Sequence, residues 1–207
     1  MKLLPTLDLE KIFRREGVEY IAGVDEAGRG PVAGPVSAAA VIFPVNEAEH
    51  LLGSLIGRVR DSKQIREEER ESIAAAIKEK ALAFSVSHVP NETIDSINIL
   101  NATRLAVRGA INSLKIKPQV VLIDGKFLNL RNFTCVSIVK GDANIFSIAA
   151  ASIIAKTSRD ALMHEYGREF PNYFFEKNKG YLTSEHLSAI RDYGFTRLHR
   201  KSFAISL

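Results

Sequence analysis

The stretch that decides the fold is Tyr20-Ile-Ala-Gly-Val-Asp-Glu-Ala-Gly-Arg-Gly-Pro31. An apolar run ends there in two adjacent carboxylates, Asp25 and Glu26, and leads into a turn with an arginine between two glycines. Adjacent strand residues point to opposite faces, so both carboxylates can serve one centre only if the strand ends or bulges there. Gly28 and Gly30 supply the conformational freedom for that. The alternative is an ordinary surface turn, because turns favour Asp and Gly for local reasons.

The same pattern recurs twice further along the chain. Val120-Val-Leu-Ile-Asp-Gly125 and Val136-Ser-Ile-Val-Lys-Gly-Asp142 are apolar runs that also lead to an aspartate next to a glycine. A single aspartate in such a place is usually a helix cap or a turn residue. Ligands of open α/β sheets bind at the carboxyl ends of strands, where acids from distant strands can meet. Three such acids therefore favour a shared site.

The apolar patterns indicate one mixed sheet with helices around it. They predict strands at 18–25, 35–43, 82–89, 119–124 and 133–139, and helices at 66–81, 144–169 and 183–192. A further long helix is expected after Pro90, capped by Asn91. Its predicted apolar face comprises Ile97, Leu100, Val107, Ile111 and Leu114. Short links between the first three strands favour antiparallel pairing, and the helical crossover before residue 119 favours parallel pairing.

Six segments, taken in order, resemble the motifs of bacterial ribonuclease HII from about residue 18 to about residue 202. They are Asp25-Glu-Ala-Gly-Arg-Gly-Pro31, Asp61-Ser-Lys63, Leu122-Ile-Asp-Gly125, Lys140-Gly-Asp142, Ser147 to Lys156 with Arg159-Asp160, and Lys179-Gly-Tyr-Leu-Thr183. The resemblance implies an α/β, RNase H-like fold. It also implies metal-dependent cleavage of RNA in RNA–DNA hybrids and 5′ to single ribonucleotides in duplex DNA, leaving 5′-phosphate and 3′-hydroxyl ends.

The acids make physical sense as metal ligands. Carboxylates about 4 Å apart repel by roughly 4 kcal/mol at an effective dielectric constant near 20, so converging acids need cations or protons between them. Hard divalent ions prefer oxygen ligands, and two of them suit phosphodiester hydrolysis. The resemblance assigns Asp25, Glu26, Asp124 and Asp142 as the catalytic metal ligands, with Mg²⁺ or Mn²⁺ as cofactor. The role of Asp160 stays open, because a surface pair with Lys156 or an arginine explains it equally well.

The resemblance also implies a set of substrate contacts. Gly28, Arg29 and Gly30 are expected at the ribose 2′-hydroxyl, and Tyr181 on the sugar of the following nucleotide. Lys63, Ser152 and Lys156 are expected at phosphates, which position a duplex without reading its sequence. Two structural alternatives remain: Arg29 pairs only with Glu26, and Tyr181 is a core residue.

Composition fits a single catalytic domain over residues 1–207, with 1–17 as an N-terminal extension. The 207 residues are 46% hydrophobic, enough for one core without disulfides. The lone Cys135 indicates a reducing compartment, and no segment has the length of a membrane span or a signal sequence, so a cytoplasmic protein is expected. The net charge of +4 permits a polyanionic partner, and the basic segment at about 170–207, with Arg191, Arg197 and Arg200, is expected to help bind it.

Other function classes fit less well. Residues 28–33 match the G-x-G-x-x-[GA] dinucleotide fingerprint, but a strand rather than a helix is predicted to follow. The histidines lack the spacing of a zinc site. Arg29, Asp142 and the short N-terminal region argue against the sister ribonuclease HIII, which usually has a lysine in the glycine turn, a glutamate as fourth acid and an extra N-terminal domain. A non-catalytic nucleic-acid-binding module is the third possibility. Residues 202–207 lack the glutamine of a sliding-clamp peptide, so no protein-partner motif is evident.

Overall fold

The computed structural model describes residues 4–45, 52–60, 62–125, 130 and 133–205. Five strands form one sheet in the order β3-β2-β1-β4-β5. The strands are β1 (Ile21–Ala27), β2 (Val36–Ile42), β3 (Ala83–Val89), β4 (Val120–Asp124) and β5 (Cys135–Ile138). β1 pairs antiparallel with β2 and β2 with β3, whereas β1 with β4 and β4 with β5 are parallel. The predicted mixed sheet, three antiparallel strands followed by parallel ones, is confirmed.

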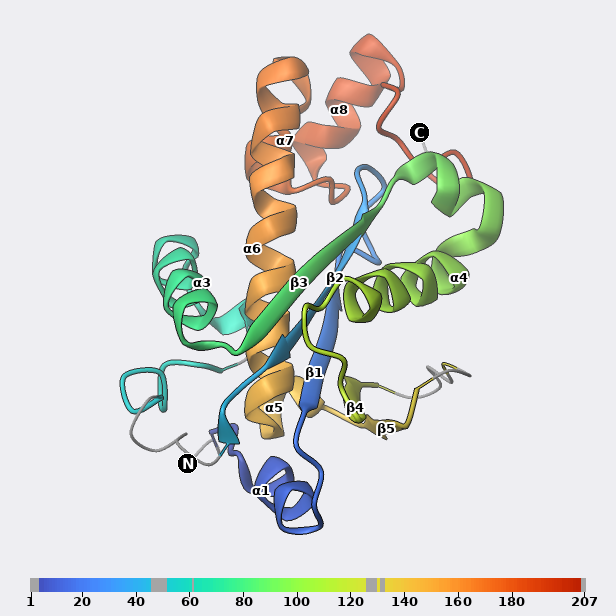
Figure 1. Cartoon of the computed structure of the whole chain (residues 1–207). Coiled ribbons are helices and arrows are strands. Elements are labelled where there is room, and N and C mark those ends of the chain that lie inside the picture. The colour runs from blue at the N-terminus through green and yellow to red at the C-terminus, as the bar shows by residue number, and fades with distance from the viewer. Residues whose placement is uncertain (1–3, 46–51, 61, 126–129, 131–132, 206–207) are drawn as a thin grey trace.

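Helices cover both faces of the sheet (Figure 1). They are α1 (Asp8–Arg15), α3 (Glu67–Lys80), α4 (Asn91–Asn112), α5 (Gly141–Asn144), α6 (Phe146–Glu169), α7 (Phe175–Asn178) and α8 (Ser184–Tyr193), with 3₁₀ turns η2 (Ser62–Gln64) and η3 (Pro171–Tyr173). Alternate residues of β2 supply the two cores, as the twofold periodicity of a strand requires. Ala39 and Val41 pack with α3 and α6, and Ala38 and Ala40 pack with α4.

The long helix α6 lies directly against β1. A Cβ atom built on Gly23 would lie 2.2 Å from the carbonyl carbon of Ser147, so only glycine permits this approach. The same end of α6 is joined to α1. Glu10 of α1 is buried, and its Oε1 accepts hydrogen bonds from the amide (3.1 Å) and the hydroxyl (2.7 Å) of Ser147. The first turn of α6 is therefore fixed from two sides.

Three expectations about strands and helices need correction. β1 neither ends nor bulges at Asp25 but continues to Ala27 in regular register with β2. Asn91 does not cap α4; its side-chain amide donates to the carbonyls of Arg197 (2.8 Å) and His199 (3.2 Å) instead. Helical geometry is interrupted at Asn98, which has φ 64°, and Leu100 beyond it is 44% exposed rather than part of the apolar face.

Among the helices of the described residues, none combines the length and the apolarity that a membrane span needs.

Candidate active site

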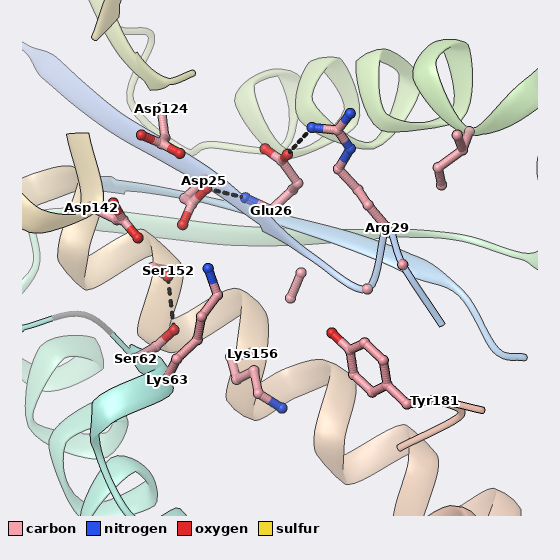
Figure 2. A pocket seen from close by; sticks show the side chains of 14 residues that line it. Asp25, Glu26, Arg29, Ser62, Lys63, Asp124, Asp142, Ser152, Lys156 and Tyr181 are labelled. Atoms are coloured by element: carbon pink, nitrogen blue, oxygen red, sulfur yellow. Dashed lines mark hydrogen bonds and ion pairs between the residues drawn. The ribbon is translucent and has the colours of Figure 1, made fainter. Parts of the chain in front are cut away.

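A pocket at the carboxyl end of β1 and β4 contains every residue that the sequence assigned to the site (Figure 2). The predicted members are Asp25, Glu26, Gly28, Arg29, Gly30, Lys63, Asp124, Asp142, Ser152, Lys156 and Tyr181. Ala27, Ser62 and Ile99 also line the pocket, although no sequence pattern assigned them to it. The acids lie in the part of the pocket next to β4 and α5, and Tyr181 lies across from the glycine turn (Figure 2).

The unequal lengths of neighbouring strands explain how two adjacent acids reach one pocket. In the register of β1 with β4, the last pair is Val24 with Ile123, so Asp124 lies beside Asp25. β4 ends there, whereas β1 continues through Glu26. Asp25 and Glu26 are adjacent in the strand, yet both line the pocket that lies where β4 ends. β1 therefore needs no end or bulge at Asp25, because it is the neighbouring strand, β4, that ends.

The carboxylates of the pocket form a group that is partly removed from water. Burial, together with the charges of Glu26 and Asp124, raises the pKa of Asp25 well above its usual value. Burial also raises the pKa of Glu26, against the effect of Arg29, whose Nη1 lies 3.1 Å from Glu26 Oε1. The other oxygen, Oε2, is buried without a hydrogen-bond partner. Asp124 Oδ1 accepts a 2.6 Å hydrogen bond from the amide of Gly141, which joins β4 to the turn that carries Asp142.

This donor set fits a hard divalent cation. Four carboxylates border one pocket, the pKa values of two are raised, and one oxygen is buried and unsatisfied. Among the described residues, however, no three Asp, Glu, His or Cys side chains are placed to hold one ion as they stand.

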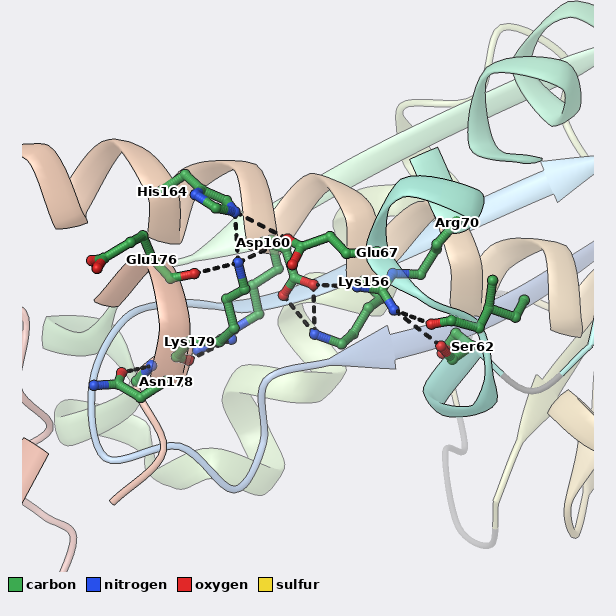
Figure 3. A network of polar contacts seen from close by, with 12 residues as sticks. Ser62, Glu67, Arg70, Lys156, Asp160, His164, Glu176, Asn178 and Lys179 are labelled. Carbon is green, nitrogen blue, oxygen red and sulfur yellow. Dashed lines mark hydrogen bonds and ion pairs between the residues drawn. The ribbon is translucent and has the colours of Figure 1, made fainter. Parts of the chain in front are cut away.

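The wall of the pocket formed by η2 and α6 depends on Asp160 (Figure 3). Asp160 accepts hydrogen bonds from Lys156 (2.6 Å) and from Arg70 (2.9 Å), and Arg70 also donates to the carbonyls of Ser62 (3.2 Å) and Ile65 (2.9 Å). The role of Asp160 was left open, with a surface pair as one alternative, but Asp160 is buried, at 3% exposure. It is not among the residues that line the pocket. Its partners show that it holds Lys156 and the turn before Lys63.

A second polar network holds Lys179, the residue that precedes Gly180 and Tyr181 (Figure 3). The ammonium group of Lys179 contacts Glu67 (2.8 Å), His164 (2.6 Å) and the carbonyl of Glu176 (2.7 Å). Although burial opposes the change, hydrogen bonds from Lys179 and His164 lower the pKa of Glu67 to about 2. Lys179 lies in the segment 170–207 that was expected to bind substrate. Its side chain instead makes hydrogen bonds within the protein.

Fewer basic side chains of the C-terminal segment lie on the surface than the sequence indicated. Arg200 and His199 are buried, whereas Arg197 is on the surface and pairs with Glu169 at 2.6 Å. Burial lowers the pKa of Arg200 to about 9 and that of Arg159 to about 10, so both guanidinium groups remain charged at neutral pH. Both donate hydrogen bonds to main-chain carbonyls around the glycine turn. No local pattern distinguishes these two arginines from solvated ones.

Tyr181 is 49% exposed, so the alternative of a core tyrosine is wrong. Its carbonyl is held by a relay of two buried imidazoles. Since His199 Nδ1 accepts from the amide of Thr196 (2.9 Å), its Nε2 donates to His186 Nε2 (3.0 Å), and His186 Nδ1 donates to the Tyr181 carbonyl (2.8 Å). The backbone of Tyr181 is therefore fixed while its ring faces solvent.

The fold and the acid-lined pocket define a nuclease of the ribonuclease H class, and comparison with solved structures agrees. The ribonuclease H2 of Pyrococcus horikoshii OT3 superposes with a TM-score of 0.73 at 27% identity, covering 89% of this chain and 93% of that one. The ribonuclease HII in a PCNA complex from Archaeoglobus fulgidus gives 0.75 at 24% identity, covering 91% and 96%.

Sequence comparison defines the class more narrowly. The family model for ribonuclease HII matches residues 22–206. The ribonuclease HII of Pelodictyon phaeoclathratiforme is 48% identical over 186 residues, 89% of each chain, and that of Clostridioides difficile is 46% identical over 201 residues, 95% of this chain and 76% of the relative. The chain belongs to the ribonuclease HII family. It is an endoribonuclease that acts on RNA–DNA hybrids, a metal-dependent hydrolase of phosphodiester bonds.

Proposed function

We propose that this enzyme, besides cutting the RNA strand of hybrids, nicks duplex DNA on the 5′ side of a single ribonucleotide and leaves 5′-phosphate and 3′-hydroxyl ends. The observation that carries the proposal is the composition of the pocket. Acids for phosphodiester chemistry and a glycine turn with an exposed tyrosine opposite it border the same space. A site that recognises one sugar needs a reader of its 2′-hydroxyl next to the reactive phosphate.

In this proposal Asp25, Glu26, Asp124 and Asp142 hold Mg²⁺ or Mn²⁺. When bound, two such ions supply an activated water and stabilise the leaving oxygen. The protein's own part is to concentrate negative charge where no cation is yet present, as the raised pKa of Asp25 indicates. Arg29 holds Oε1 of Glu26, so Oε2, which has no hydrogen-bond partner, is the oxygen that Glu26 offers to a cation.

The remaining pocket residues bind substrate in this proposal. Arg29, whose side chain is half exposed between Gly28 and Gly30, lies at the 2′-hydroxyl, and Tyr181 packs on the next sugar, favouring deoxyribose there. Lys63, Ser152 and Lys156 contact phosphates. We further propose that residues 1–207 act as one catalytic domain in the cytoplasm, with 1–17 as an extension, and that duplex DNA containing ribonucleotides lies against the segment 170–207.

Cleavage of a labelled duplex with one ribonucleotide, with and without EDTA, tests the reaction. We expect a single nick 5′ to the ribonucleotide, a product with a 5′-phosphate, and no reaction in EDTA. Asp25→Asn and Asp124→Asn should abolish cleavage, whereas Glu79→Gln, at an exposed position on α3 outside the pocket, serves as a charge-matched control. In metal-free buffer Asp25→Asn should also raise the melting temperature, since it removes one of several repelling carboxylates.

The role of Tyr181 in recognising the ribonucleotide is tested on the same substrate with Tyr181→Ala. We expect folding and metal binding to be retained and cleavage at the single ribonucleotide to fall severely. Phe84→Ala is the matched control, because Phe84 is an exposed aromatic residue (39%) outside both the pocket and the segment 170–207. An unchanged rate for folded Tyr181→Ala would place the recognition of the junction elsewhere.

A further inference from the structure

The carbonyl groups of the glycine turn are held by a buried arginine from the other end of the chain. The guanidinium group of Arg200 donates to the carbonyls of Gly28 (2.6 Å), Arg29 (3.0 Å), Gly34 (3.0 Å) and Pro35 (3.1 Å). Arg200 is only 1% exposed. The planar, multiply donating group of an arginine suits this pattern, whereas the compact ammonium group of a lysine cannot span it.

A second buried arginine extends the same arrangement to the segment that carries Tyr181. Arg159 of α6 donates to the carbonyls of Pro35 (2.9 Å), Ala33 (3.2 Å) and Lys179 (2.9 Å). It also explains why residue 28 is glycine, since a Cβ atom there would lie 2.1 Å from Arg159 Nε. The glycine turn and the segment that carries Tyr181 are the two parts of the proposed site for the 2′-hydroxyl. Arg200 and Arg159 thus hold both parts by hydrogen bonds to their carbonyls.

The direction of the carbonyls determines the direction of the amides. In a trans peptide the C=O of one residue and the N–H of the next point in opposite directions across one plane. Arg200 draws the carbonyls of Gly28 and Arg29 toward the interior, so the N–H groups of Arg29 and Gly30 point the opposite way. Both residues line the pocket. The turn therefore offers donors to the pocket, and two buried positive charges behind it polarise those donors.

We propose that Arg200, assisted by Arg159, is a positioning residue that aims the amides of Arg29 and Gly30 at the 2′-hydroxyl and so sets the selectivity for ribonucleotides. This inference rests on the proposed function, in which the turn reads that hydroxyl. Arg200 itself touches no substrate in this view. It acts through the peptide planes that it holds.

The test compares binding of two duplexes that differ by one 2′-hydroxyl. Fluorescence anisotropy is measured in the Asp25→Asn background, which should bind without cutting. We expect Arg200→Lys to lower the preference for the ribonucleotide duplex by about tenfold, the factor for losing one or two hydrogen bonds, with little change for all-DNA duplex. Arg58→Lys is the matched control, since Arg58 lies outside the pocket and the segment 170–207 and donates to the hydroxyl of Ser72 at the surface.

The outcomes separate the inference from the function on which it rests. If the Asp25→Asn parent binds both duplexes equally, the proposed reader fails. If the parent prefers the ribonucleotide and a folded Arg200→Lys keeps the full preference, the positioning role is wrong. Circular dichroism establishes folding, and Arg159→Lys replaces Arg200→Lys if the latter does not fold.

A measurement on the unmutated pocket needs no arginine variant. In NMR spectra recorded in EDTA, where no cleavage is expected, binding of the ribonucleotide duplex should shift the amide protons of Arg29 and Gly30 downfield more than all-DNA duplex does. The guanidinium protons of Arg200 should exchange slowly with water in both states. Rapid exchange of these protons, or equal shifts with both duplexes when binding itself is selective, would overturn the proposal.

Discussion

Replacing Asp160 by asparagine should destabilise the enzyme far more than the loss of an ordinary ion pair. The side chain of Asp160 is 4% exposed and that of its partner Arg70 is 8% exposed, with 2.9 Å between Nη2 and Oδ2. Asparagine keeps the shape but leaves the guanidinium group buried without its counter-charge. Breaking such a buried pair costs roughly 3–5 kcal/mol, which is about 6–20 °C in melting temperature for a protein of this size.

Urea unfolding in metal-free buffer measures the effect, with Glu169→Gln as the control on the same helix. Glu169 pairs with Arg197 at 2.6 Å, but the two side chains are 46% and 57% exposed, and an exposed pair contributes only about 0–1 kcal/mol. The midpoint should therefore fall markedly for Asp160→Asn and hardly at all for Glu169→Gln, at an unchanged slope. KM for a hybrid should also rise in Asp160→Asn, because Lys156 and the turn at Ser62 lose their support. Equal midpoint shifts in the two variants would refute this reasoning.

Three further predictions concern other parts of the fold. The pKa of Glu67 is about 2 in place of 4.5, so its stabilising contribution should be complete above pH 4.5 and disappear as the pH falls toward 2. The difference in unfolding free energy between wild type and Glu67→Gln should follow that course, and a difference independent of pH would contradict it. Gly23→Ala should lower the free energy of unfolding in urea by about 1–3 kcal/mol or more, because the new Cβ atom meets the backbone of Ser147. A smaller loss would show that α6 can move away from β1. Burial, with the nearby charge of His186, lowers the pKa of His199 to about 4, so its contribution should be complete above pH 6.5 and be lost as the pH falls toward 4; an imidazole titration by NMR with a midpoint near 6.5 would disprove the assignment.

Much of the fold followed from local patterns because the sheet is buried on both faces. The apolar runs of β1, β2 and β4 are continuous, and each prediction differed from the observed bounds by only a few residues. The pocket residues were found because their motifs lie at strand ends and in turns, where sequence and position are closely tied. Arrangements that depend on register were not found. The end of β4 at Asp124 was predicted, but nothing in the sequence around Asp25 shows that β1 continues to Ala27.

The remaining errors concern polar residues whose partners are distant in the chain. Arg200, Lys179 and Asp160 have the sequence character of solvated residues, yet all three are buried. Lys179 and Glu67, for example, are 112 residues apart. The break of α4 at Asn98 was missed for a different reason, since an asparagine within a helical pattern is compatible with an unbroken helix.

The tie between Arg200 and Gly28 spans 172 residues of chain, and this has a consequence for biosynthesis. A nascent chain holds Asp25, Glu26, Asp124 and Asp142 long before residue 200 is made. The carbonyls of the glycine turn gain their guanidinium partner only after nearly all of the described chain has been synthesised. The acids are thus assembled from chain that is translated earlier, and the arrangement that we propose for telling ribose from deoxyribose is completed last.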